Sequence, residues 1–179
     1  MGDGDGAQAA SGRGERGEER IDVGALLAKE AIREALYREL DAWRRRDWTQ
    51  LRAGFVPGAR VELGFEGAHA VDAQVGRLAE SMRGYVASSL LASNCQVELG
   101  LGGVAARSSA LVLATHEPPA ESGERTRLEA LRFSDRWTRD VDGEWRVSAR
   151  RTESLWRAWL EPRRDDRTGD HRNAAEWER

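Results

Sequence analysis

Residues 131–151 read LRFSDRWTRDVDGEWRVSARR, and this stretch decides the fold of the chain. Leu131, Phe133 and Trp137 stand at two-residue multiples, a spacing that places them on one face of a β-strand. Asp142-Gly143 then favours a tight hairpin turn, and residues 144–151 alternate again. The stretch therefore predicts an antiparallel hairpin with one apolar face.

The segments on either side of the hairpin extend this pattern. Alternating apolar residues predict further strands over 93–101 and 104–116, and the hairpin's first strand begins near residue 128. Three- and four-residue spacing marks the first half of the chain as mainly helical. The predicted elements there are a long helix over 26–43 capped by Asp22, a short helix over 48–55 stopped by Val56-Pro57-Gly58, a strand over 60–65 and a helix over 71–86. Residues 155–160 predict a closing helical turn, and the whole order indicates an α+β fold.

Composition divides the chain into one domain and two tails. Residues 1–20 are rich in glycine and charge, and residues 162–179 are similarly polar, so neither segment can bury enough apolar surface to offset the entropy of ordering. We therefore predict disordered tails at 1–20 and 162–179 around a single folded domain at 21–161. Trp177 is the one residue of the C-terminal tail expected to dock on the domain.

Bulk charge and cysteine content narrow the classes of function. The formal net charge is −3, which offers no general attraction for nucleic acid or for an anionic membrane. The single Cys95 excludes an internal disulfide and fits a reducing compartment. No apolar run reaches the roughly 20 residues that span a bilayer, and the acidic N-terminus does not resemble a signal peptide. We expect a cytoplasmic protein.

Four stretches together resemble the SnoaL-like group of the nuclear transport factor 2-like superfamily. They are AIREALYRELDAWRRRDWTQLRAGF at 31–55, FEGAHAVDAQ at 65–74, SSLLASNCQVEL at 88–99 and the hairpin at 131–151. The resemblance implies a cone-shaped barrel, in which a curved mixed or antiparallel sheet wraps around the long first helix. An apolar cavity lies inside the cone. Relatives include scytalone dehydratase, hexachlorocyclohexane dehydrochlorinase, ketosteroid isomerase and polyketide cyclases, whereas other members only bind or scaffold. It also implies cofactor-free lyase, isomerase or cyclase chemistry and a homodimer.

The elimination enzymes of this group use an aspartate–histidine dyad, and this chain departs from it. The aspartate position, just before the RRDW segment, falls on Arg44. The histidine position falls on Leu90, while Asn94 matches the family's asparagine. Because an arginine cannot orient an imidazole and a leucine transfers no proton, dyad-type chemistry is not expected.

Two other acids are the candidates for proton transfer. Period-two alternation places Asp135 on the same strand face as Glu129, and the resemblance makes that the cavity face. Asp41 lies one helical turn before Arg44 and can share its helix face. An acid in an apolar cavity has a raised pKa and can act as acid or base. The structural alternatives are an Asp135 ion pair with Arg44 or Arg150, and a surface pair between Asp41 and the neighbouring arginines.

Two functional hypotheses follow. In the first, an enzyme uses Asp135 or Asp41 as acid or base and Arg44 to stabilise an enolate, acting on an apolar substrate of polyketide, aromatic or steroid-like character. In the second, the protein binds a ligand or acts as a dimeric partner subunit without catalysis; an oxygenase β-subunit role is a further variant. The residues expected to line the pocket are Leu36, Tyr37, Leu40, Leu90, Asn94, Leu111, Leu113, Glu129, Leu131, Phe133 and Trp137.

The remaining histidines and tryptophans carry weaker signals. His69, His116 and His171 are scattered without ligand spacing, so no metal site and no cofactor are expected. Trp43 and Trp145 fall on apolar stripes and are assigned to the core. Trp137, together with Trp156 and Trp159, is expected at the mouth of the cone or at a dimer interface.

Overall fold

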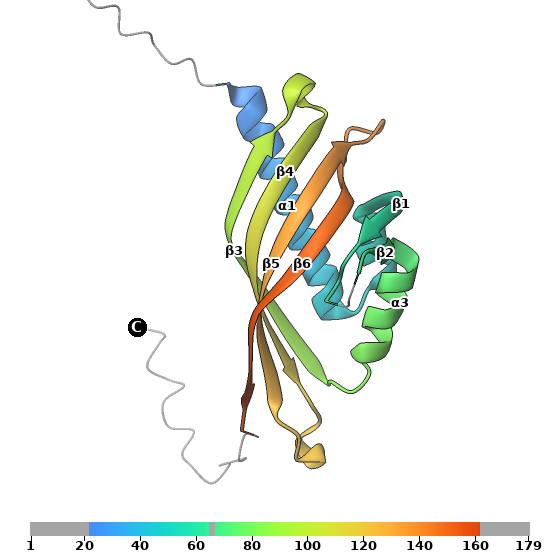
Figure 1. The fold of residues 1–179 in the computed structure, drawn as a ribbon, viewed down its shortest axis with the longest axis vertical. Helices are drawn as coiled ribbons and strands as arrows, with labels where there is room; N and C mark the ends of the chain where they lie inside the picture. Colours follow the sequence, from blue (N-terminus) through green and yellow to red (C-terminus); the bar gives the residue numbers. More distant parts are fainter. Residues whose placement is uncertain (1–21, 65–66, 162–179) are drawn as a thin grey trace, which may run out of the picture.

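A computed structural model describes residues 22–64 and 67–161 of the chain. The predicted tails, together with Phe65, His171 and Trp177, lie outside these described residues. Figure 1 shows a strongly bent sheet whose long strands twist past one another, with the first helix running along one side of it. The helix over residues 71–81 packs beside the short strands at the edge of the sheet. None of the helices described is both long and apolar enough to cross a membrane.

The first helix, α1, runs over Val23–Arg45 and has the predicted cap. The Asp22 carboxylate accepts a hydrogen bond from the Ala25 N–H at 3.0 Å, which satisfies one of the free donors of the first turn. The helix ends at Arg46, which takes a left-handed conformation with φ 60°. A short helix, α2 (Trp48–Ala53), follows, capped by Asp47. Helix α3 (Val71–Ser81) ends five residues before the predicted limit at Val86.

Six strands form one mixed sheet in the order β2-β1-β6-β5-β4-β3. The strands are β1 (Phe55–Val61), β2 (His69–Ala70), β3 (Ala87–Leu99), β4 (Ala105–Glu117), β5 (Thr126–Arg139) and β6 (Trp145–Leu160). Strand β1 pairs with β6 in parallel, and all other neighbours are antiparallel. Asp142-Gly143 forms the predicted turn between β5 and β6, with Gly143 at φ 86°.

Three predictions besides the end of α3 differ from the structure. Val56-Pro57-Gly58 lies within β1 instead of ending a helix, because Pro57 falls in the irregular part of the β1–β6 pairing between Phe55 and Arg60, where no ladder bond needs its missing N–H. Strand β3 begins at Ala87, six residues before its predicted start. Residues 155–160 continue β6 and do not form a helical turn, because pairing with β5 extends to Leu160 opposite Thr126. Long-range pairing has overridden local helical spacing there.

The core lies between α1 and the concave side of the sheet. Ile32 and Leu36 from α1 are fully buried, and Phe133 and Val147 face them from β5 and β6. Each such side chain contributes about 1.5–3 kcal/mol by leaving water. Trp43 and Trp145 belong to this core, as predicted. The cone is therefore packed at its centre, and its remaining hollows lie to the sides.

Candidate functional site

Three buried ionisable side chains meet at the centre of the cone. Arg150 on β6 donates two hydrogen bonds to Asp135 on β5, from Nε to Oδ1 and from Nη2 to Oδ2, each at 2.7 Å. Its Nη1 donates a third to Oε2 of Glu39 on α1, at 2.8 Å. All three side chains are at most 3% exposed. This triad ties the first helix to both strands of the hairpin that decides the fold.

The triad holds two carboxyls around one guanidinium, so its charges do not balance. Burial is the main cause that raises the pKa of Glu39 from 4.5 to about 7; nearby Arg150 lowers it and Asp135 raises it. Burial is the largest single influence on the pKa of Arg150 and lowers it, but Asp135 and Glu39 together hold that pKa above its ordinary value. The guanidinium also lies over the Phe133 ring, 4.4 Å from its centroid. Glu39 is thus the member of the triad that can change charge near neutral pH.

Local backbone geometry brings Glu39 into this position. The acid stands on the buried stripe of α1, between Leu36 and Trp43. Gly54, at the end of α2, packs directly against it: a Cβ atom at residue 54 would lie 2.8 Å from Cγ of Glu39. Only glycine leaves room for the carboxyl at this point.

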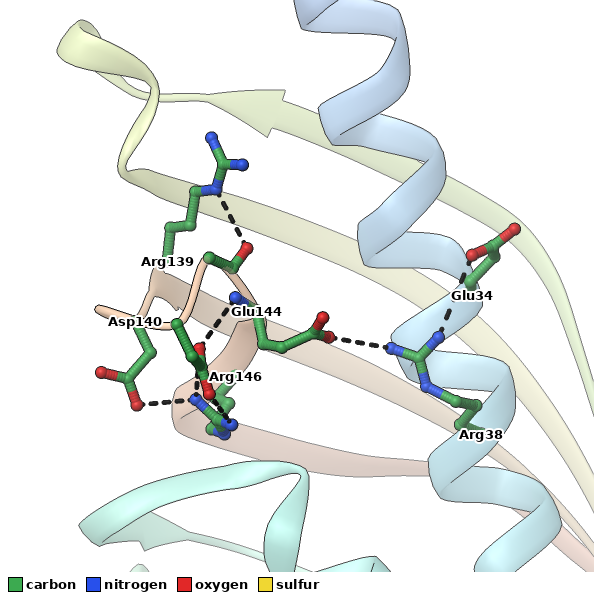
Figure 2. Close-up of polar contacts among 8 residues, drawn as sticks. Glu34, Arg38, Arg139, Asp140, Glu144 and Arg146 are labelled. Carbon is green, nitrogen blue, oxygen red and sulfur yellow. Dashed lines mark hydrogen bonds and ion pairs between the residues drawn. The ribbon is translucent and has the colours of Figure 1, made fainter.

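A small hollow of about 140 Å³ opens beside Glu39. Gly54 and Trp145 line it, and charged side chains stand at its rim. Figure 2 shows Arg38 of α1 reaching toward Glu34 and Glu144, with nitrogen–oxygen distances of 3.9 and 3.7 Å. The Glu144 contact joins α1 to the β5–β6 turn, while the other rim cation, Arg146, bonds Asp140 at 2.7 Å.

A larger cavity of about 290 Å³ lies at the mouth of the cone, between α3, the first half of β5 and the second half of β6. We call it the mouth cavity. Its apolar wall is formed by Trp43, Leu63, Leu78, Met82 and Leu131. This volume is at the lower end of the range for small-molecule sites, which favours a compact ligand over a polycyclic one.

The polar wall of the mouth cavity holds one carboxylate between two arginine side chains. Glu129 is 5% exposed and forms an ion pair with Arg157 on β6. Its second oxygen lies 3.1 Å from Nη2 of Arg127. Two further donors are buried without a hydrogen-bond partner among the residues described, the Trp43 indole N–H and the Arg127 Nε–H. The wall therefore combines a carboxylate with an excess of hydrogen-bond donors.

The structure places the residues predicted on β5 on the buried face of that strand. Glu129, Leu131, Phe133, Asp135 and Trp137 are each at most 5% exposed. Glu129 and Leu131 line the mouth cavity, whereas Asp135 is held by Arg150, the structural alternative considered for it. The catalytic role of Asp135 stays a prediction. Trp137 is not at the mouth of the cone, because its indole donates to Ser108 Oγ at 2.8 Å inside the core.

Asp41 and Arg44 lie away from the triad and the mouth cavity. Their side chains are about half exposed and pair with each other at 2.8 Å, and Asp41 also pairs with Arg45. They line a surface groove of about 260 Å³ between α1 and β3. Tyr37, Leu40 and Leu90 of the predicted pocket line the same groove. These five residues therefore do come together, but outside the cone, because α1 presents Leu36, Glu39 and Trp43 inward instead.

Four other predicted pocket residues occupy different positions. Leu111 and Leu113 stand on the outer face of β4, since Ala110, Val112 and Ala114 are the buried ones. The continuous apolar run there gave no alternation from which to choose a face. Asn94 is exposed at an irregularity in the β3 pairing, with φ 50°. Leu36 is in the core and lines neither of the two cavities inside the fold.

His116 is buried and neutral. Burial first, and then the nearby Arg127 and Arg46, lower its pKa from 6.5 to about 4. Its Nδ1 is 2.9 Å from Ser88 Oγ, and its ring contacts Tyr85. His69 lies on β2. Over the parts of the chain that the structure covers, no three His, Cys, Asp or Glu side chains gather closely enough to hold a metal ion.

With this geometry in view, comparison with known proteins places the chain. The family model for the SnoaL-like domain matches residues 24–151. The chain belongs to the SnoaL-like domain family. A search of curated proteins returned no match.

Solved structures share the cone fold of this SnoaL-like chain. A scytalone dehydratase-like protein from Novosphingobium aromaticivorans DSM 12444 has a TM-score of 0.68 and 21% identity, over 80% of this chain and 94% of its own. A type 3 hexachlorocyclohexane dehydrochlorinase from Novosphingobium barchaimii LL02 has a TM-score of 0.66 and 16% identity, over 78% and 94%. ActVI-ORFA from Streptomyces coelicolor reaches 0.60 and 12%, over 70% and 96%. At these identities the likeness shows the nuclear transport factor 2-like fold of this SnoaL-like chain and leaves its chemistry to its own residues.

Sequence reasoning missed Glu39 as a member of the site. A signal was present, because the acid stands between Leu36 and Trp43 on the apolar stripe of the first helix. An acid on a buried stripe needs a cationic partner, and Arg150 was available on the predicted inner hairpin. Arg157 was missed for a different reason, since residues 155–160 were expected to be helical.

Proposed function

We propose that this SnoaL-like chain is a cofactor-free proton-transfer enzyme, an isomerase, lyase or cyclase, that acts in the mouth cavity. The observation that carries the proposal is the buried Glu129 carboxylate in a cavity wall between Arg127 and Arg157. Proton transfer next to a carbonyl needs a base and a group that accepts the developing oxyanion charge. Glu129 supplies the first and the two guanidiniums supply the second.

The substrate class follows from the cavity walls. Trp43, Leu78 and Leu131 favour an apolar body, and the guanidiniums favour a carbonyl or enolate oxygen at one end. A volume of about 290 Å³ favours one or two rings over a steroid-sized skeleton. In the proposed step Glu129 removes a proton from the carbon beside the carbonyl. Arg157, which is 45% exposed, turns from Glu129 toward the enolate oxygen as the substrate enters.

The test is exchange of α-protons in heavy water, using 2-tetralone as an enolisable ketone of suitable size. We expect the protein to accelerate loss of the α-proton NMR signal over buffer, and Glu129→Gln to lose about 100-fold or more of that acceleration. Asp41→Asn is the matched control, because its carboxylate lies in the outer groove, and it should retain the full rate. Equal rates for Glu129→Gln and the unmodified protein would remove Glu129 from the mechanism.

A non-catalytic ligand-binding role is the second candidate. It is favoured by the ion pair that holds Asp135 against Arg150 and by Leu90 at the position of the family's histidine. In that case ketone binding is measurable by calorimetry while proton exchange stays at the buffer rate. The two roles are therefore separated by one pair of measurements on the same sample.

A further inference from the structure

Two arginines stand directly opposite each other on the outer face of the sheet. Arg107 on β4 is the register partner of Arg136 on β5. Both are exposed, and their chain neighbours Ala106, Asp135 and Trp137 are buried, so both side chains leave the sheet on the side away from α1. Residues paired in this way have Cβ atoms about 4.5–5.5 Å apart. Two positive charges are thus held side by side by the backbone.

Nothing in the described part of the chain neutralises this arginine pair. Across residues 22–64 and 67–161, neither guanidinium has a hydrogen bond or an ion pair. Glu98 is the register partner of Arg107 on β3, yet it does not come within ion-pair distance. Arg132, the next outward arginine along β5, does have an acid, Glu153 at 3.4 Å. Like charges directly opposite on a sheet are destabilising. The arginine pair therefore lowers the stability of the fold, and no acid among the described residues offsets its repulsion.

A surface hollow accompanies the pair. It encloses about 500 Å³ and is lined by Arg107 and Arg136, with Glu98, Thr138 and Ser148 beside them. Arg151, two register positions farther along the same outer face, is opposite Ser134 on β5 and is also exposed. Guanidinium groups present several N–H donors in a rigid plane that matches the oxygens of phosphate or carboxylate. The hollow gives such a group room to contact both arginines at once.

We propose that Arg107 and Arg136 bind one small oxyanion, a phosphate or a carboxylate group of a soluble molecule, on the outer face of the sheet. The anion removes the repulsion between the two arginines, and Thr138 supplies a hydroxyl at the edge of the hollow. Glu98 limits the site to a ligand that approaches from the β5 side. This site is separate from the mouth cavity and does not depend on the proposed enzymatic function.

The experiment is calorimetric titration of sodium phosphate, and separately of sodium acetate, into the full chain at constant ionic strength. We expect one site per chain for at least one of these anions, weakened at least tenfold in Arg107→Gln and in Arg136→Gln. The matched control Arg132→Gln, on the same face but already paired with Glu153, should bind as the unmodified chain does. In chloride alone, Arg136→Gln should raise the melting temperature by about 2 °C, because it removes the repulsion.

Three results would overturn the proposal. The first is the same affinity in Arg136→Gln as in the unmodified chain. The second is binding to vesicles of anionic lipid with none to phosphate or acetate. The third is a dimer in sedimentation velocity that Arg136→Gln dissociates, with no anion bound, since the acids of a second copy would then be the partner of the arginine pair.

Discussion

Replacing Glu39 by glutamine should change how the stability of the protein depends on pH. The folded state keeps the proton of Glu39 up to a pKa of about 7, whereas the unfolded chain loses it near 4.5. Stability from this difference is therefore complete below pH 4.5 and is lost as pH rises through 7. The gap between 4.5 and about 7 corresponds to about 3 kcal/mol. Glutamine carries no charge at any pH and can still accept the Arg150 hydrogen bond.

The assay is urea unfolding followed by circular dichroism, from pH 5 to pH 8.5, on the unmodified protein and Glu39→Gln. We expect the free energies of unfolding of the two proteins to be similar near pH 5. The variant should then gain on the unmodified protein by up to about 3 kcal/mol above pH 8. Glu34→Gln, on the exposed side of the same helix, is the matched control and should show no such divergence. A difference between Glu39→Gln and the unmodified protein that stays constant across this range would refute the reasoning.

Three further measurements test the triad, its packing and the buried histidine. Arg150→Met leaves two carboxyls buried without a cation and should cost about 3–5 kcal/mol in urea unfolding, with part of the loss restored by adding Asp135→Asn; no recovery in the double variant would contradict the pairing. Gly54→Ala forces a methyl group against Glu39 and should cost about 1–3 kcal/mol, less in a Glu39→Ala background; additive losses would show that the two residues do not touch. The His116 imidazole should show no NMR titration between pH 5.5 and 8, because its pKa is lowered to about 4, and a midpoint near 6.5 would place it in water.

The elements with strong periodicity were predictable, and those fixed by long-range pairing were not. The first helix, its Asp22 cap and the β5–β6 turn follow from local spacing and turn chemistry. The second half of β6 carries helical spacing in its sequence but takes its conformation from β5 across the ladder. Burial on β5 also followed from alternation. On β4, the uninterrupted apolar run left the choice of face to tertiary packing.

The candidate site was predictable only in part, because it depends on contacts between distant residues. Asp135 could be placed on an inner face, and its pairing with Arg150 was one of the two alternatives considered. The meeting of Glu39 with Arg150, 111 residues apart, could not be derived from either local pattern. Asp41 and Arg44 share one face of α1, as predicted, but that face lines the outer groove with Leu90, because the apolar stripe of the helix runs through Leu36 and Trp43.

Binding in the mouth cavity tests the central claim most directly. The measurement is calorimetric titration of 2-tetralone into the unmodified chain and into Leu131→Trp, whose larger side chain fills the cavity between Trp43 and Met82. We predict one bound ketone per chain for the unmodified protein and none for a Leu131→Trp variant that unfolds at a similar urea concentration. Undiminished binding to folded Leu131→Trp would mean that the ligand sits elsewhere and that Glu129 does not face a substrate.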